Sequence, residues 1–155
     1  MEQQMPKLIL IAVLVLGFMP ISTHASDYVE HEHVKARIAL VPDAGNTMAT
    51  LDIVLAEDWH SYGDPPGDAG LPPRFDWTAS ENLQDIQIEL PPTTPKTEME
   101  EFTVNSYSDQ ILIPLAVTPE DASKDVTLDL KLTLMICKDI CIPESFELSH
   151  VLKAD

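Results

Sequence analysis

The sequence VTLDLKLTLMI, residues 126–136, alternates apolar and polar side chains more cleanly than any other part of the chain. Every second position holds an apolar side chain: Val126, Leu128, Leu130, Leu132, Leu134 and Ile136. Successive side chains of a β-strand point to opposite faces of the sheet, so this period predicts a strand with one buried face. A second extended run, SFELSHVL (residues 145–152), follows after CKDIC, with Phe146 and Leu148 expected to point inward.

Weaker alternation recurs upstream and predicts further strands at residues 34–41, 47–56, 83–90 and 110–117. Pro114 marks the last of these as an edge or bulged strand. The longest turn-rich segments are residues 62–74 and 91–101, and the chain holds 13 prolines. Short strands separated by turns predict an all-β fold, an antiparallel immunoglobulin-like β-sandwich. Strands do not alternate with helical patterns, which argues against a parallel α/β sheet and a thioredoxin fold.

The first 25 residues have the pattern of a signal peptide. Lys7 precedes an apolar run at residues 8–18, and small residues lead to Ala25. We expect cleavage after Ala25, which leaves a single domain at residues 26–155; an uncleaved N-terminal anchor is the alternative. The apolar run is shorter than the roughly 20 residues that a membrane-spanning helix needs. The expected location is therefore the periplasm, outside the reducing cytosol, where disulfides persist.

The chain is strongly acidic, with 26 Asp and Glu against 9 Lys and Arg and a net charge of −17. A surface of this sign repels phosphate groups, so nucleic acid and anionic membranes are excluded as partners. The chain lacks an HExxH motif and a recognisable Ser–His–Asp pattern, so we do not expect a hydrolase. We expect no cofactor and no metal, and we take the domain to be a monomer.

The only two cysteines, Cys137 and Cys141, flank a three-residue connection between the two C-terminal strands. Residues that flank such a hairpin loop face each other, with Cα atoms roughly 4.5–5.5 Å apart, which allows a disulfide. Ile136 belongs to the buried set, so Cys137 is expected on the opposite face, and the same count puts Cys141 there. Both sulfurs are therefore expected at or near the surface.

This spacing leaves three uses of the cysteines open. A structural staple is common in small secreted domains, but closing about five residues contributes only about 2 kcal/mol. An outward-facing disulfide suits thiol–disulfide exchange. Asp139 and Glu144 beside the pair disfavour a thiolate, so an activated partner thiol is the expected nucleophile. Zinc needs four ligands, and nothing in the spacing brings His60 or His150 to the cysteines.

Two further histidines, His31 and His33, share one face of an extended segment near the expected mature N-terminus. Such a pair binds copper or zinc in some proteins and is a solvated tail in others. The sequence leaves both readings open.

Three segments in this order resemble the periplasmic N-terminal domain of the thiol:disulfide interchange protein DsbD family, and in particular its ScsB-like branch. They are DWHSYGDPPGDAGLPPRFDW (residues 58–77), ILIPLAV (residues 111–117) and LMICKDICIPESFELS (residues 134–149). The resemblance covers about residues 58–152. One departure is Gly63, where the family pattern has tryptophan. Trp59, His60 and Tyr62 are interpreted as packing residues of the fold.

The resemblance implies a protein-disulfide reductase type of component whose cysteine pair cycles between dithiol and disulfide. The redox pair corresponds to Cys137 and Cys141. Family members take electrons from a membrane-embedded domain and pass them to thioredoxin-like periplasmic proteins, including those of cytochrome c maturation. Such members continue into further domains whereas this chain stops at Asp155, so we expect a separate DsbD-type membrane partner.

A cap loop with an aromatic residue shields the disulfide in that family. The segment EEFTVNSYSD, residues 100–109, lies in the corresponding place. It makes Phe102 the first candidate for the cap and Tyr107 the second. Glu100 and Glu101 are the candidate acidic neighbours of the cysteines, together with Asp139. The competing hypothesis is a non-redox binding module, for a protein or a metal, whose disulfide only stiffens a hairpin.

Overall fold

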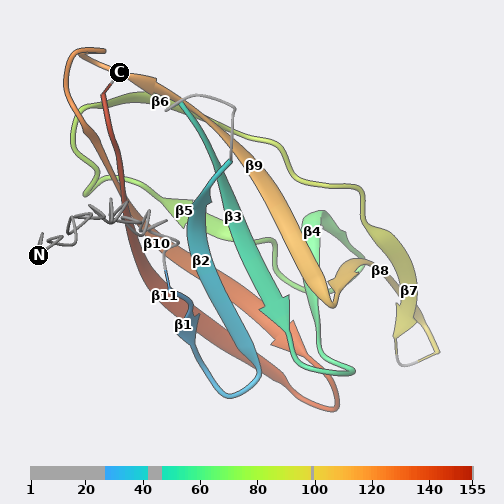
Figure 1. Ribbon diagram of the computed structural model, residues 1–155. Coiled ribbons are helices and arrows are strands. Elements are labelled where there is room, and N and C mark those ends of the chain that lie inside the picture. Colours follow the sequence, from blue (N-terminus) through green and yellow to red (C-terminus); the bar gives the residue numbers. More distant parts are fainter. Residues whose placement is uncertain (1–26, 42–46, 99, 155) are drawn as a thin grey trace, which may run out of the picture.

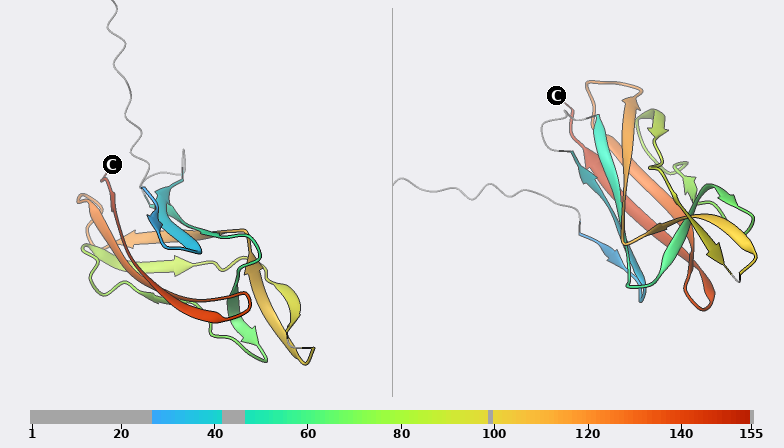
Figure 2. Two further views of the ribbon diagram at one scale, coloured as in Figure 1. Left: turned by 90° about the horizontal axis from the view of Figure 1, so that it is seen from below. Right: turned by 90° about the vertical axis from the view of Figure 1, so that its right-hand side faces the viewer.

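The computed structural model describes residues 27–41, 47–98 and 100–154, and within these ranges the chain is all β. Eleven strands form two antiparallel sheets packed face to face, as the sequence predicted for an immunoglobulin-like sandwich (Figures 1 and 2). The described ranges hold no helix long and apolar enough to cross a membrane. The predicted signal peptide, residues 1–25, lies outside the described residues.

The first sheet has the strand order β1-β2-β3-β9-β6. Its strands are β1 (Val29–Glu30), β2 (Val34–Leu40), β3 (Met48–Leu55), β6 (Leu83–Ile88) and β9 (Gln110–Pro119). The buried face carries the alternating apolar residues of these strands, such as Leu51, Ile53, Ile113 and Leu115. The alternation read from the sequence therefore gives the correct inward face.

The second sheet has the order β11-β10-β4-β8-β7, with β5 paired to β10 outside this path. Its strands are β4 (His60–Gly67), β5 (Arg74–Asp76), β7 (Thr94–Glu98), β8 (Phe102–Ser108), β10 (Val126–Cys137) and β11 (Cys141–Leu152). The hairpin of β10 and β11 stays in register from Val126 opposite Leu152 to Cys137 opposite Cys141. Figure 1 shows this hairpin as the longest feature of the fold, with β4, β7 and β8 together at one end.

The core lies between the sheets, and the period of two in β10 decides its composition. The six alternating apolar residues of the 126–136 run are at most 5% exposed, and Phe146 and Leu148 of β11 are buried with them. Burying one such aliphatic or aromatic side chain stabilises the fold by about 1.5–3 kcal/mol. The sequence prediction of this buried face is confirmed.

Two details of the predicted strands are wrong. Strand β9, which contains Pro114, is not an edge strand, because it pairs with both β3 and β6, and it has no bulge at Pro114, because the register shift in its pairing with β6 lies between Leu83 and Asp85. The carbonyl of Pro114 accepts a hydrogen bond from Glu89 N, just beyond the end of β6. In an antiparallel strand the N and the C=O of a residue point to the same neighbour, so the missing N–H does not interrupt the ladder with β3. In addition, the segments read as turns contain β4 and β7.

Candidate functional site

The cysteine pair closes the β10–β11 hairpin. Cys137 and Cys141 are cross-strand partners, with Cα atoms 4.1 Å apart, and their sulfurs form a disulfide. The loop between them is held by a hydrogen bond from Lys138 N to Ile140 O, and Lys138 Nζ forms an ion pair with Asp58 at 3.0 Å. The predicted disulfide between these facing residues is confirmed, although their Cα atoms are closer than the roughly 4.5–5.5 Å expected.

The two sulfurs differ in their access to solvent. Both cysteines lie outside the main core, as the alternation predicted, but only Cys141 is exposed. Cys137 is 2% exposed, because it belongs to a second apolar cluster on the outer face of the sheet with Tyr62 and Val104. The prediction that both sulfurs are near the surface is therefore wrong for Cys137. Strands β4 and β8, which cover it, came from segments in which the sequence predicted no complete strand.

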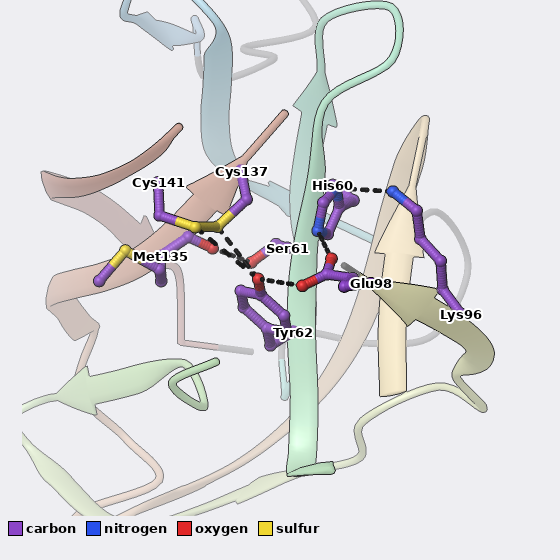
Figure 3. The surroundings of a disulfide bond; sticks show 8 residues. All are labelled: His60, Ser61, Tyr62, Lys96, Glu98, Met135, Cys137 and Cys141. Carbon is purple, nitrogen blue, oxygen red and sulfur yellow. Dashed lines mark hydrogen bonds and ion pairs between the residues drawn. A yellow bond between two sulfur atoms is a disulfide. The ribbon is translucent and has the colours of Figure 1, made fainter. Parts of the chain in front are cut away.

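The hydroxyl of Tyr62 is the polar group nearest to the disulfide in this cluster. It donates a hydrogen bond of 3.0 Å to Cys137 Sγ, and it lies 3.9 Å from Cys141 Sγ (Figure 3). Burial, with the nearby negative charge of Glu98 and a hydrogen bond to it, raises the pKa of Tyr62 to about 12. The hydroxyl therefore keeps its proton near neutral pH, and this one proton is within hydrogen-bonding distance of both the buried sulfur and Glu98 Oε2.

Strand register places Tyr62 there. Cys137 lies opposite His60 and Ile136 opposite Ser61, so His60, Tyr62 and Cys137 share the outer face of the sheet. Ser61 Oγ fixes this contact by donating to Met135 O at 3.0 Å. Sequence reasoning assigned His60 and Tyr62 to packing and missed their place beside the disulfide. Their shared parity was the available signal, but it required knowing that β4 pairs with β10.

The β7–β8 hairpin extends the polar contacts from Tyr62. The hydroxyl of Tyr62 is 3.3 Å from Glu98 Oε2, and the other oxygen of Glu98 contacts His60 Nε2. Lys96 Nζ lies 3.2 Å from His60 Nδ1. Burial and the positive charge of Lys96 lower the pKa of His60 below its ordinary value, although Glu98 acts in the opposite direction. Figure 3 shows these side chains as one connected line ending at Cys137.

The other residues singled out from the sequence lie farther along the same two hairpins. Glu100 and Glu101 are exposed in the turn that joins β7 to β8. Phe102 begins β8, is 37% exposed, and lies opposite Glu98 in the register. Asp139 is exposed in the loop of the cysteine hairpin, beside Ile140, which is 65% exposed.

Tyr107, the second cap candidate, is buried in the main core. Its hydroxyl donates to Pro91 O at 2.7 Å. The carboxylate that contacts Tyr62 is that of Glu98, which sequence reasoning did not single out.

The histidines considered as metal ligands are held by other contacts. His31 stacks on Phe146 and pairs with Glu144, while His33 stacks on Trp59 with ring centroids 4.1 Å apart. Among residues 27–41, 47–98 and 100–154, no group of three or more His, Cys, Asp or Glu side chains is arranged to hold a metal ion.

The departure at Gly63 has a steric counterpart in the structure. A Cβ atom on Gly63 would lie 2.3 Å from the methyl carbon of Thr93. The place that a larger side chain needs is therefore already occupied by the segment preceding β7.

Fold and site together define an immunoglobulin-like domain with one disulfide at the end of a hairpin, one sulfur buried under a tyrosine and the other exposed. Residues 26–153 match the family model described as the N-terminal domain of the thiol:disulfide interchange protein DsbD. The chain belongs to this family, as the resemblance read from the sequence implied.

Two solved structures are similar to the chain. The N-terminal periplasmic domain of ScsB from Proteus mirabilis superposes with a TM-score of 0.62 at 20% identity, over 79% of this chain and 49% of that one. The chain therefore spans about half the length of that structure. The N-terminal domain of Neisseria meningitidis DsbD in the reduced form gives a TM-score of 0.46 at 12% identity, over 77% and 90% of the two chains. Comparison with curated protein sequences finds no match.

Proposed function

We propose that this chain is a periplasmic thiol–disulfide exchange protein whose Cys137–Cys141 disulfide is reversibly reduced. It takes electrons from a membrane-embedded DsbD-type partner and passes them to thioredoxin-like periplasmic proteins. Membership of the DsbD N-terminal family supports a general role in thiol–disulfide exchange. The observation that carries the proposal is the asymmetry of the disulfide, with Cys141 exposed and Cys137 buried against a hydroxyl donor.

The asymmetry assigns a role to each sulfur. A thiolate on the reducing partner attacks Cys141 Sγ, the sulfur that solvent reaches. The S–S bond breaks, its electron pair stays on Cys137 as a thiolate, and Cys141 becomes linked to the partner in a mixed disulfide. A second partner thiolate attacks the partner's own sulfur in that bond and releases Cys141. The pair is then reduced, and the partner dithiol is oxidised to a disulfide.

Tyr62 contributes to the first step. The leaving thiolate forms in a cluster that excludes water, where a negative charge is costly unless it is hydrogen-bonded. The Tyr62 hydroxyl is already 3.0 Å from that sulfur and needs no rearrangement to stabilise the charge. Glu100, Glu101 and Asp139 remain the proposed acidic neighbours of the pair, and Phe102 at the start of β8 is the proposed cap.

The first experiment is the reduction potential of the pair, measured by equilibration against glutathione or dithiothreitol. We expect a value of about −200 to −270 mV, the range of exchange proteins. A value well below about −300 mV marks a structural disulfide. That result would support the competing function, a binding module whose disulfide only stiffens the hairpin.

A matched pair of variants tests the assignment of the sulfurs. With Cys137→Ser, the exposed Cys141 remains and is expected to trap a mixed disulfide with a thioredoxin-like protein. With Cys141→Ser, the buried Cys137 remains and is expected to trap little. Equal trapping by both variants would contradict the assignment, and no trapping by either would contradict exchange itself.

A further inference from the structure

We propose that His60 is a proton-relay residue, which connects a solvent-filled cleft to Cys137 Sγ through Glu98 and Tyr62. This inference rests on the proposed function, because it describes how the buried cysteine acquires its proton during reduction. His60 does not touch the sulfur; it acts through the two side chains that lie between.

Reduction of the disulfide creates a need for such a path. When the partner thiolate attacks Cys141, Cys137 leaves as a thiolate in a cluster where it is 2% exposed and close to the Glu98–Tyr62 pair. Burial and a nearby carboxylate both favour the neutral thiol. Until it is protonated, the Cys137 thiolate can attack the mixed disulfide and reverse the step. Net reduction therefore depends on how fast one proton reaches this sulfur.

The path follows the contacts in order from the sulfur outward. Tyr62 donates to Cys137 Sγ at 3.0 Å, and Glu98 Oε2 is 3.3 Å from the same hydroxyl. Glu98 Oε1 contacts His60 Nε2, and Lys96 Nζ is 3.2 Å from His60 Nδ1. An ammonium group can only donate, so Nδ1 accepts and the proton of the neutral ring lies on Nε2, the atom in ion-pair contact with Glu98 Oε1. The Tyr62 hydroxyl has one proton and the Glu98 carboxylate can only accept, so the Glu98–Tyr62 link carries a proton inward only after His60 has protonated Glu98.

The outer end of the path opens to solvent. His60 and Lys96 line a cleft of about 530 Å³ between β4 and the β7–β8 hairpin, together with Trp59 and Ser108. The His60 side chain itself is only 5% exposed. The ring therefore separates the cleft from the disulfide cluster, with Nδ1 on the Lys96 side and Nε2 on the Glu98 side (Figure 3).

One transfer moves a single proton along this path. Tyr62 gives its hydroxyl proton to the Cys137 thiolate, and its oxygen takes the proton of the Glu98 carboxyl group. Glu98 had received that proton at Oε1 from His60 Nε2 and presents it to Tyr62 after turning about its Cγ–Cδ bond. His60 takes a proton at Nδ1 from Lys96, which recovers one from water in the cleft. The net change is one proton moved from the cleft to Cys137.

Several charged groups face His60 and belong in any account of its pH dependence. Lys96 and Glu98 approach from β7, and Tyr62 lies edge-on at 5.5 Å on the same strand. Cys137 is the cross-strand partner from β10. The remaining acidic groups lining the cleft are Glu57, Asp58 and Asp109. Their effects on the reductant-driven rate cancel when the reduction rate of a His60 variant is divided by that of the unmodified protein, provided that they act equally on both.

The experiment compares His60→Gln with the unmodified protein. The rate of disulfide reduction by dithiothreitol is measured for both from about pH 6 to about pH 8.5, at one reductant concentration, and the ratio of the two rates is taken. The ratio cancels the ionisation of the reductant. Glutamine keeps a polar group but cannot pass a proton. We expect disulfide reduction to be slowed about a hundredfold near pH 8.5, the low side of what positioned proton transfer contributes.

The slowing of disulfide reduction by His60→Gln is expected to be smaller near the acid end of this pH range. With the path cut, Cys137 depends on hydronium from solvent, which becomes scarcer as the pH rises, whereas the path has its own donor in the ammonium of Lys96. A purely structural effect of the substitution would lower the rate by the same factor at every pH.

His150→Gln is the matched control. His150 is a half-buried histidine of the same sheet, opposite Leu128 in the β10–β11 register. It lies nine residues along the strand from Cys141, about 30 Å away. The reduction rates of the His150→Gln variant are expected to equal those of the unmodified protein at every pH. An equal slowing by both substitutions would overturn the proposal.

A double substitution tests whether His60 acts through Tyr62. In a Tyr62→Phe background the path is already broken, so adding His60→Gln is expected to change the rate profile no further. A full additional loss in that background would overturn the relay. Where His60→Gln proves unstable in urea denaturation, Glu98→Gln interrupts the same path and is expected to give the same dependence on pH.

The outcomes separate the relay from the proposed function. A rate ratio that stays constant with pH, in a protein that still forms mixed disulfides with a thioredoxin-like protein, overturns the relay alone. A protein that traps no thioredoxin-like partner through Cys141 overturns the proposed function, whatever the rate ratio.

Discussion

Gly70 lies against the ring of Tyr62, and a Cβ atom on Gly70 would come within 2.4 Å of Tyr62 Cδ1. The backbone of Gly70 has φ +91°, a conformation that other residues rarely adopt. The loop after β4 thus uses a glycine to press its backbone onto the tyrosine whose hydroxyl reaches the buried sulfur. The proline- and glycine-rich segment serves the site by holding one side of this ring.

Gly70→Ala is expected to destabilise the domain and displace Tyr62. The positive φ alone costs about 1–3 kcal/mol for a residue with a side chain, and the clash with the ring adds to it. Urea denaturation measures the loss. Gly63→Ala is the comparison, because its new methyl group would also clash, at 2.3 Å from the Thr93 methyl carbon, but would not press on the ring of Tyr62. Only Gly70→Ala is expected to slow reduction of the disulfide as well, and an equal slowing by both substitutions would contradict the role given to Gly70.

Tyr62→Phe is expected to leave the fold intact and slow reduction of the disulfide. The ring still fills the cluster, but the donor to Cys137 Sγ is lost. A hydrogen bond to a charged group contributes about 1.5–3 kcal/mol, so the rate with dithiothreitol should fall by about ten- to a hundredfold. An unchanged rate would show that the hydroxyl does not stabilise the leaving thiolate.

Several strands of this fold could be predicted from the alternation in the sequence, because apolar residues at every second position identify the buried face of a strand. Strand β10 and the inward residues of β11 could be predicted in this way. The same alternation predicted that both cysteines face away from the main core. The alternation describes one sheet face, however, and says nothing of what covers the other.

The cover of Cys137 could not be predicted for that reason. Strand β4, HSYGDPPG, alternates for only three residues before glycine and prolines, and its pairing with β8 shifts register between Tyr62 and Gly67. Strand β7, TPKTE, has no apolar residue at all. The contact of Glu98 with Tyr62 depends on tertiary pairing between these two strands and β8. Local sequence patterns do not encode such pairing.

Reduction of the disulfide is expected to leave the domain folded. The bond closes a loop of five residues, with a sequence separation of 4, and the chain-entropy contribution of such a loop is about 2 kcal/mol. Thermal denaturation of the oxidised and reduced forms should therefore give a modest difference in Tm, with both transitions cooperative. A reduced form without a cooperative transition would be incompatible with a protein that cycles between both states.

Asp52 is expected to make stability depend on pH. It is 3% exposed on β3 and accepts hydrogen bonds from Gln110 at 2.8 Å, from Tyr28, and from Arg37 at 3.1 Å. Burial alone would raise the pKa of Asp52, but these hydrogen bonds outweigh it and hold the pKa below its ordinary value. The charged form is thus favoured more in the folded than in the unfolded chain.

The sign of the effect follows from that direction. The stabilisation by Asp52 is fully present above the pKa of the unfolded chain, about 3.9 for aspartate, and is lost as the pH falls through the lower folded value. Asp52→Asn should therefore cost about 1–3 kcal/mol in urea denaturation at neutral pH, and the loss should diminish in acid. Asp85→Asn, on the exposed side of β6, should stay within about 0.5 kcal/mol. If the cost of Asp52→Asn were the same at low and neutral pH, its source would be packing rather than the charge.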